Sequence, residues 1–437
     1  MISIFTLTST LHDKAAVDAA TKEFLEGLGI EYSFKGDDYE DYGSDLSLIF
    51  VRTGGTEGLF KELLPTLQGL SRQPILLLTS GKSNSLAASM EILSYLRQEG
   101  LRGEILHGSP SYIRSRIEAL SKVEEARRFL EYKTLGIVGH PSDWLISSGF
   151  DRDVILDKLG ISLQYIPMEE LLEEYSSLKD EVAESWKEVQ SLRSACRSLS
   201  GAEGLSGVEG PLNDTNRSLS GAEGLSGVEG PLPTPVKQAI PGAYRLYKAL
   251  RTLVTDYGLS GLTIRCFDLL TAIHNTGCLA LARLNSEGYV AGCEGDVPAM
   301  LSMMIGRAVS GVSGFQANPS SIDPETGEIV FSHCTVPLDM VSSFGLDTHF
   351  ESGIGVGIRG QLPSGPVTVF KVSGDLSRHF VCEGELLRCE AKPDLCRTQT
   401  VLKLPASAAS YFLTEPIGNH HVILPGHHAA VLEALLV

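Results

Sequence analysis

The sequence predicts an α/β protein in which two parallel-sheet domains are followed by a C-terminal antiparallel, β-barrel-like domain. In the first 170 residues, short apolar stretches alternate with segments whose apolar residues recur at helical spacing, which is typical of strand–helix–strand units. A second series of this kind begins at residue 134. After Asn318 the pattern changes to short alternating strands separated by Gly and Pro, which indicates an antiparallel barrel.

The first domain is expected over residues 1–132 and holds a doubly wound parallel sheet. Residues 74–79 form a continuous apolar run, as expected of a strand that is buried on both faces. A capping signal at Ser83 or Asn84 favours the start of a helix there. The expected strands are 2–7, 46–51, 74–79 and a short one around Ile105, and the expected helices are 13–28, a segment after Glu57, 84–99 and 112–132.

The second α/β domain is expected over residues 133–318. Its first strand leads into the loop His140-Pro141-Ser142-Asp143-Trp144, at the carboxyl end of that strand. Ligands collect at such positions in open α/β sheets. The expected strands are 134–139, 163–166, 262–267 and 289–291, and the expected helices are 152–159, a strongly charged one at 168–196, 235–257, 279–284 and 297–310.

A duplicated segment interrupts the second domain at 197–233. Residues 197–212 recur letter for letter at 217–232. Two copies are too few for a solenoid, and a Gly-, Ser- and Glu-rich segment cannot bury enough apolar side chains to offset its ordering entropy. We expect a flexible surface insert without chemistry.

The third domain, expected over residues 319–437, is rich in short strands. Alternation of apolar and polar residues between Gly and Pro turns indicates antiparallel pairing. The expected strands are 329–334, 367–372, 379–382, 385–389 and 400–404, and two short helices are expected at 406–413 and 428–436.

Composition excludes some classes of partner. The net charge is −18 and the isoelectric point is near 5.1, so no basic surface is available for nucleic acid. No apolar run approaches the ~20 residues that a membrane helix needs. The N-terminal residues are expected to enter a strand directly, without a signal peptide. The eight cysteines show no CxxC pair, as expected of reduced thiols in a cytoplasmic protein.

The stretch Cys293-Glu294-Gly295-Asp296 joins an apolar strand to a helix. Asp296 can cap that helix, and a proline two residues on is tolerated in a first turn. Glu294 is expected to face the positive end of the helix dipole, which keeps a carboxylate ionised. Imidazoles come from His333, on an alternating strand, and from Asn419-His420-His421. A carboxylate with two separated histidines is a composition typical of metal sites.

The same residues also have interpretations without a ligand. Glu294 could be a helix-entry charge, and His333 could be a hydrogen-bonded core histidine. His420-His421 and His427-His428 could form a surface cluster. Trp144 could stack on a sugar face or serve as a packing residue. Arg265 could bind an anionic or hydroxyl group of a substrate, or pair with one of the many surplus carboxylates.

Several short motifs run from residue 54 to residue 421 and cover the chain apart from the insert. They are Gly54-Gly55-Thr56-Glu57, Asn84-Ser85-Leu86, Gly139-His140-Pro141-Ser142-Asp143-Trp144-Leu145-Ile146, Cys293-Glu294-Gly295-Asp296, Phe315-Gln316-Ala317-Asn318-Pro319, Ser332-His333-Cys334 and Gly418-Asn419-His420-His421. Together they resemble the L-fucose isomerase-like family, which is related more distantly to L-arabinose isomerase. The resemblance implies two Rossmann-like α/β domains, a C-terminal barrel domain, and a homo-oligomer (trimer or hexamer) with sites near subunit boundaries.

The resemblance also implies roles for individual residues. Glu294 matches a metal-binding carboxylate that also serves as an acid/base group, and His420 matches the C-terminal metal histidine. His333 matches an additional ligand of the arabinose isomerase branch. Where fucose isomerases place an aspartate, this chain has Asn318, which can coordinate or orient through its amide oxygen but brings no charge and cannot act as a base. The possible replacements for the missing carboxylate are Asp296, Asp323 and Glu351.

The expected function is a divalent-metal-dependent, cytoplasmic sugar isomerase that interconverts aldoses and ketoses through an enediolate. Mn²⁺ suits mixed carboxylate and imidazole ligation, and a positioned carboxylate can move the proton between C1 and C2. Two alternatives stay open: another metal-dependent carbohydrate enzyme, such as an epimerase or lyase, or a non-catalytic sugar-binding protein. The candidates for substrate binding are Trp144, Asp143, Arg265, His421 and Glu351.

Overall fold

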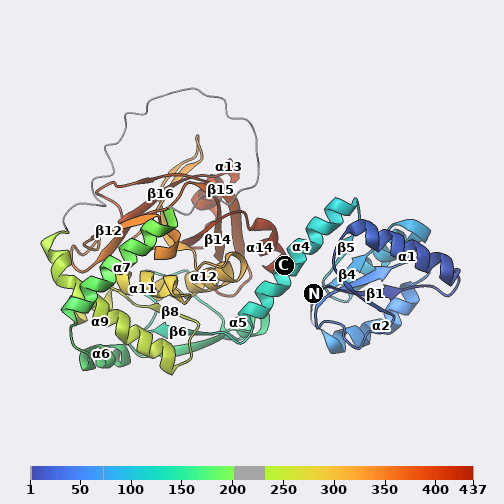
Figure 1. The fold of residues 1–437 in the computed structure, drawn as a ribbon, viewed down its shortest axis with the longest axis horizontal. Coiled ribbons are helices and arrows are strands. Elements are labelled where there is room, and N and C mark those ends of the chain that lie inside the picture. The colour runs from blue at the N-terminus through green and yellow to red at the C-terminus, as the bar shows by residue number, and fades with distance from the viewer. Residues whose placement is uncertain (1, 72, 201–231, 437) are drawn as a thin grey trace. The chain divides into compact units, whose positions relative to one another are not determined.

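A computed structural model of the chain describes residues 2–71, 73–200 and 232–436. It divides into two compact units, Met1–Glu125 and Ala126–Val437, which are called here the first and second unit (Figure 1). The boundary falls within helix α4 (Pro110–Leu130). The domain limits expected at residues 132 and 318 stay predictions.

The first unit is built on a five-stranded parallel sheet with the strand order β2-β1-β3-β4-β5. Neighbouring strand residues point to opposite faces, so Phe5 and Ile49 belong to one apolar cluster while Ile4 and Leu48 belong to another. Both faces are therefore buried, as the continuous apolar runs predict. The strands are β1 (Ile2–Leu7), β2 (Ser33–Gly36), β3 (Leu46–Val51), β4 (Ile75–Leu78) and β5 (Gly103–Leu106); with α4, the helices are α1 (Lys14–Leu28), α2 (Glu57–Leu70), η1 (Lys82–Asn84) and α3 (Ser85–Gln98).

The second unit begins with a four-stranded parallel sheet in the order β7-β6-β8-β9. Its charged helix, expected as one segment over 168–196, is two helices, because Leu178 is extended at ψ 159° and interrupts the turn. The strands are β6 (Thr134–Val138), β7 (Ser162–Ile166), β8 (Gly261–Ile264) and β9 (Val290–Cys293); the helices are α5 (Arg152–Leu159), α6 (Met168–Ser177), α7 (Val182–Ser200), α9 (Thr234–Asp256), α10 (Asp268–Ala272), α11 (Cys278–Ser286) and α12 (Val297–Ser310).

The rest of the second unit is a closed antiparallel barrel with the order β10-β11-β16-β15-β14-β17. Phe315, Phe331 and Ile423 help to fill its core. The barrel strands are β10 (Phe315–Asp323), β11 (Glu328–His333), β14 (Gly365–Val372), β15 (His379–Glu390), β16 (Thr398–Lys403) and β17 (His421–Pro425); beside them lie η2 (Leu338–Met340), the hairpin β12 (Ser343–Asp347) and β13 (Gly357–Gln361), and the helices α13 (Ala406–Thr414) and α14 (Ala429–Leu436). The predicted fold class, two parallel sheets followed by an antiparallel barrel, is confirmed.

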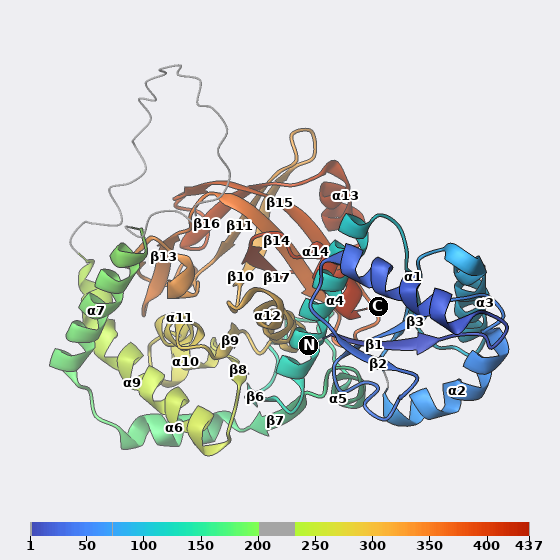
Figure 2. The same ribbon diagram turned by 45° about the vertical axis from the view of Figure 1, so that its right-hand side comes forward.

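Helix α12 joins the parallel sheet of the second unit to the barrel. It packs against β8 and β9 on one side and against β14 and β17 on the other (Figure 2). Gly306 allows this close approach, because a Cβ there would lie 2.8 Å from the side chain of Leu424. The amino end of α12 is thereby held where the strand end of β9 meets the barrel.

Two further expectations concern the insert and membrane-spanning helices. The insert expected at 197–233 lies for the most part outside the described residues, apart from its first four and last two positions. Among the helices that the structure describes, none is long and apolar enough to span a bilayer.

Candidate metal centre

Glu294 occupies a strained turn between β9 and α12. Its φ is 65°, in the left-handed region that residues with a side chain rarely adopt, and Gly295 follows at φ 68°. A Cβ at position 295 would lie 2.7 Å from the carbonyl oxygen of His140, so glycine is required there. Asp296 then caps α12 by accepting a hydrogen bond from the backbone N–H of Ala299. Strain of this kind is concentrated at functional sites.

The two predicted histidines meet Glu294 at the end of the barrel. His333 ends β11 and His420 immediately precedes β17. Glu294 Oε1 lies 3.4 Å from His420 Nε2 and 3.6 Å from His333 Nε2. The candidate ligand atoms of all three residues lie within 4.8 Å of one another, and all three residues are buried. Segments far apart in the sequence thus converge as predicted.

The charges of the three side chains depend on one another. Burial alone would raise the pKa of Glu294, but His420 and His333 outweigh it and hold that pKa well below its usual range. Burial would lower the pKa of His420, yet Glu294 and Asp296 raise it to about 9. Without a bound cation, the two shifts favour a protonated His420 beside an ionised Glu294.

The surroundings of His420 fit a metal ligand. Its Nδ1 donates a hydrogen bond to Asp296 Oδ2 over 2.8 Å, while its Nε2 is buried without a hydrogen-bond partner. A metal-bound histidine usually donates its second N–H to a carboxylate in this way. Nδ1 of His333 is also buried without a hydrogen-bond partner. One carboxylate and two imidazoles in this arrangement could hold a divalent ion.

Comparison with known proteins finds a distant similarity to a sugar isomerase. No family model matches the chain. Over 275 residues it is 26% identical to the sulfoquinovose isomerase of Clostridium sp. (strain MSTE9). The chain is distantly related to a sugar isomerase. The match covers 62% of this chain and 54% of that protein, so the chain spans about half the length of the relative.

Trp144 contacts the centre through a hydrogen bond. Its indole Nε1 donates to Glu294 Oε2 over 2.7 Å, and its ring packs edge-on against Phe267 at 4.7 Å. Half of the residue is exposed. The backbone N–H of Ser142, in the same loop, donates to the carbonyl oxygen of Glu294. The loop after β6 therefore binds Oε2 and the backbone carbonyl oxygen of Glu294, whereas Oε1 faces the two histidines.

Arg265 and Asp143 form an ion pair at this loop. Arg265 Nη2 lies 2.9 Å from Asp143 Oδ2, and its Nε lies 3.1 Å from Asp268 Oδ1. Its Nη1 also donates to the carbonyl oxygen of Pro141. The guanidinium lowers the pKa of Asp143 through a hydrogen bond. Of the two interpretations of Arg265, this geometry favours pairing with carboxylates.

The other candidates lie in different settings. Asn318 pairs with Ser332 across β10 and β11, next to His333, and its Oδ1 is buried without a hydrogen-bond partner. His421 is fully buried, with Nδ1 bonded to the carbonyl oxygen of Asn419 and Nε2 to the hydroxyl of Tyr411. Glu351 is exposed in the loop between β12 and β13. The structure does not bring His421 and Glu351 to the three converging side chains.

Sequence reasoning missed Lys371, a buried lysine that lies 3.7 Å from Asp296. It also treated Asp296 as a helix cap or a replacement ligand, without the bond to His420. The available signal was a lysine in the run Val367-Thr368-Val369-Phe370-Lys371-Val372, which contains no other charged residue.

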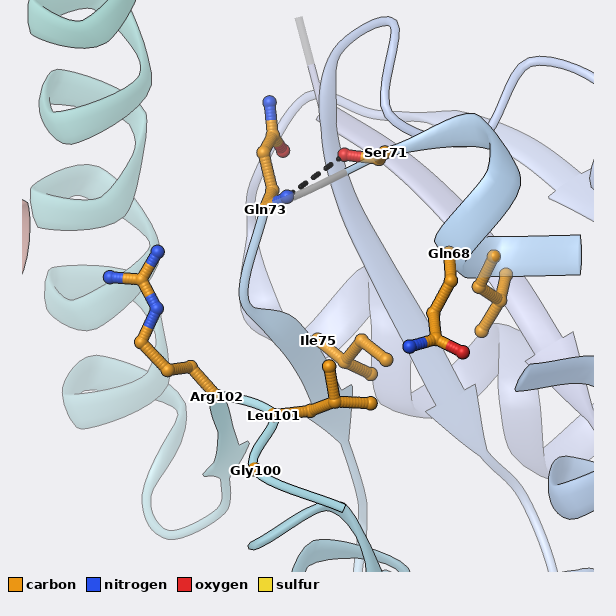
Figure 3. Close-up of a pocket in the computed structure, with 8 residues that line it drawn as sticks. Gln68, Ser71, Gln73, Ile75, Gly100, Leu101 and Arg102 are labelled. Atoms are coloured by element: carbon orange, nitrogen blue, oxygen red, sulfur yellow. Dashed lines mark hydrogen bonds between the residues drawn. The ribbon is translucent and has the colours of Figure 1, made fainter. Parts of the chain in front are cut away.

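A hollow in the first unit is a weaker candidate. It has a volume of about 220 Å³ and lies at the amino ends of β4 and β5 (Figure 3). Its lining residues are Leu67, Gln68, Ser71, Gln73, Ile75, Gly100, Leu101 and Arg102. Ligands in open α/β sheets bind at the carboxyl ends of strands, at the opposite edge. We therefore assign no function to it.

Proposed function

We propose that this protein is a divalent-metal-dependent isomerase that interconverts an aldose and a ketose. The convergence of Glu294, His333 and His420 on one buried point carries the proposal. The distant relationship to a sulfoquinovose isomerase supports the reaction class. Mn²⁺ is the proposed ion, because it accepts mixed carboxylate and imidazole ligands and leaves positions open for sugar oxygens.

The three converging residues would have different roles in metal binding and proton transfer. His420 and His333 would hold the ion through Nε2, and Glu294 through Oε1, the oxygen that faces both histidines. A divalent ion bound there would polarise the carbonyl and hydroxyl oxygens of the sugar. Glu294 would also move the proton between C1 and C2, because it is an ionised carboxylate at the same point as the two imidazoles.

Several neighbours would shape the site. Trp144 would fix the second oxygen of Glu294 and present its exposed edge to the sugar. Asn318 would act as a weak ligand or an orienting hydrogen-bond partner through its unpaired Oδ1. Arg265 would hold the loop of Trp144 through Pro141 and Asp143. A homo-oligomer is part of the same proposal.

Turnover by the purified protein tests this function directly. The protein is stripped with a chelator, reloaded with Mn²⁺, and incubated in D₂O with aldoses that include sulfoquinovose, L-fucose and L-arabinose. We expect a ketose product. It should carry deuterium wherever the proton held by Glu294 exchanges with solvent before it is returned to the sugar. Glu294→Gln should abolish turnover; full activity in that variant, or no ketose from any sugar, would refute the proposal.

Asn318 supports a second candidate, an epimerase or lyase on the same scaffold. An amide in place of a family carboxylate removes one base, and both alternatives need a different arrangement of proton donors and acceptors. The same incubation separates them, because an epimerase returns an aldose of altered configuration and a lyase returns two shorter fragments.

A further inference from the structure

A buried cation lies behind the candidate metal centre. Lys371, on β14, is 1% exposed, and its Nζ has no hydrogen-bond partner. Val367 and Val369 belong to the barrel core, and Lys371 continues their two-residue alternation. An ammonium removed from water at such a place is costly unless a charge of opposite sign compensates it.

Asp296 is the compensating charge. Its Oδ2 lies 3.7 Å from Lys371 Nζ, an ion-pair distance, and Asp296 is fully buried as well. Both of its oxygens are already fixed, because Oδ1 accepts from the N–H of Ala299 and Oδ2 accepts from His420 Nδ1. The carboxylate therefore cannot turn toward Lys371, and the lysine acts on it mainly through its charge.

The groups form a continuous line from lysine to ligand. Lys371 faces Asp296, Asp296 holds the ring of His420, and Nε2 of that ring faces Glu294. With a divalent ion present, the two carboxylates would cancel its charge, and the ammonium of Lys371 would leave one net positive charge at the centre. Enolisation of a sugar develops one negative charge, which such a centre complements.

We propose that Lys371 and Asp296 are a positioning pair that sets the charge of the metal centre. Asp296 orients His420 and strengthens metal binding, whereas Lys371 weakens metal binding but keeps the loaded centre positive for the anionic intermediate. The second half of this inference rests on the proposed isomerase function. A purely structural ion pair has a different consequence, since removing either partner would then weaken metal binding through loss of local order.

The sign of the change in metal affinity separates these two roles. Calorimetric titration of Mn²⁺ into the metal-stripped protein needs no sugar and no turnover. We expect Asp296→Asn, which keeps a helix-capping side chain, to bind Mn²⁺ about 10–100-fold more weakly. Lys371→Met should bind it about threefold more tightly or better, because a neighbouring positive charge is gone. Lys371→Met should still bind Mn²⁺ more tightly if binding releases a proton from His420. The ion adds two positive charges and the proton removes one, so the centre gains one positive charge.

The double variant keeps the test valid if Lys371→Met does not fold. Replacing both members of a buried ion pair is often tolerated where removing one is not. Adding Lys371→Met to Asp296→Asn should raise Mn²⁺ affinity relative to Asp296→Asn alone. Lys403→Met, which removes an exposed lysine on β16, should leave affinity unchanged. Weaker or equal Mn²⁺ binding on loss of Lys371, in both backgrounds, would overturn the proposal.

Turnover adds the second readout. In Mn²⁺-saturated Lys371→Met we expect kcat to fall roughly tenfold while Mn²⁺ binds more tightly, a combination that local disorder does not produce. An unchanged kcat would overturn the role in catalysis. Mn²⁺ affinity could fall in Asp296→Asn and rise in Lys371→Met while the protein isomerises no sugar. That result would refute the proposed function but support the role of the pair in metal binding.

Discussion

Trp144 donates its indole N–H to Glu294 Oε2 over 2.7 Å, across 150 residues of sequence. The other oxygen of Glu294 faces His333 and His420. The two carboxylate oxygens therefore have different neighbours. Oε2 contacts the loop after β6, and Oε1 contacts the candidate metal ligands. The hydrogen bond also fixes the plane of a carboxylate whose backbone is already held in a left-handed conformation.

Trp144→Phe should lower kcat/KM by about 10–100-fold, because a hydrogen bond to a charged group contributes about 1.5–3 kcal/mol. Phenylalanine keeps an aromatic ring against Phe267 and loses the N–H donor. Steady-state kinetics with a turned-over aldose measures the effect, and Trp186→Phe is the matched control. A raised KM with unchanged kcat would instead favour the sequence-based interpretation, in which Trp144 merely stacks on the sugar.

The fold could be predicted because its strands carry strong local patterns. Buried parallel strands such as Ile75–Leu78 are continuous apolar runs, and the barrel strands are short runs bounded by Gly and Pro turns. The edge strand Ser33–Gly36 was missed, because it is short, partly exposed and mixed in composition. Leu178 also gave no local sign that it would divide a charged helix.

The candidate site was predictable only in part. The position of Glu294 follows from a strand end before a helix cap. Composition suggested a metal site that includes histidines, and the family resemblance gave His333 and His420 their roles as ligands. The contact with Trp144 and the buried pair of Asp296 and Lys371 depend on side-chain directions set by tertiary packing. No pattern along the chain encodes such directions.

The left-handed backbone conformation of Glu294 should lower the free energy of unfolding. Glu294→Gly and Glu294→Ala both remove the carboxylate, so their difference isolates the backbone. At φ 65° we expect the glycine variant to be more stable by about 1 kcal/mol, measured by urea unfolding of the metal-free proteins. The same pair at Glu328, in β11, should show the reverse order, because glycine weakens a strand. An alanine variant at 294 as stable as the glycine one would show that the turn relaxes.

His421 should make the second unit sensitive to acid. Burial lowers the pKa of His421 to about 3, and its Nε2 needs its lone pair for the hydroxyl of Tyr411, which itself accepts from the N–H of Ile417. The unfolded chain takes up this proton near pH 6.5, so the stabilisation is complete above that pH and is lost as the pH falls toward 3.

The expected loss is about 1.4 kcal/mol for each pH unit below about 6.5. Both tryptophans, Trp144 and Trp186, lie in the second unit, so fluorescence during urea unfolding follows that unit. In His421→Phe the ring should pack among Phe380 and Phe412 with a smaller pH slope. Equal slopes in the two proteins would show that another group governs the acid response.

Asn318→Asp tests whether the amide belongs to the metal centre. Asn318 lies on β10, which pairs with β11, the strand that ends at His333, and with β17, the strand that His420 immediately precedes. Its Oδ1 is buried and unpaired. A carboxylate there, without a partner in the metal-free protein, should lower the free energy of unfolding by about 1–3 kcal/mol.

A divalent ion should reverse that loss if the new carboxylate reaches it. Thermal unfolding is measured for both proteins with chelator and with excess Mn²⁺, and the rise in Tm on adding Mn²⁺ should be larger in Asn318→Asp than in the original chain, because tight binding to the folded state stabilises it. Asn318→Ala, which offers no oxygen, should show a smaller rise than either. An identical rise in all three proteins would place residue 318 outside the coordination of the ion, since neither an added nor a removed ligand would then have changed its affinity.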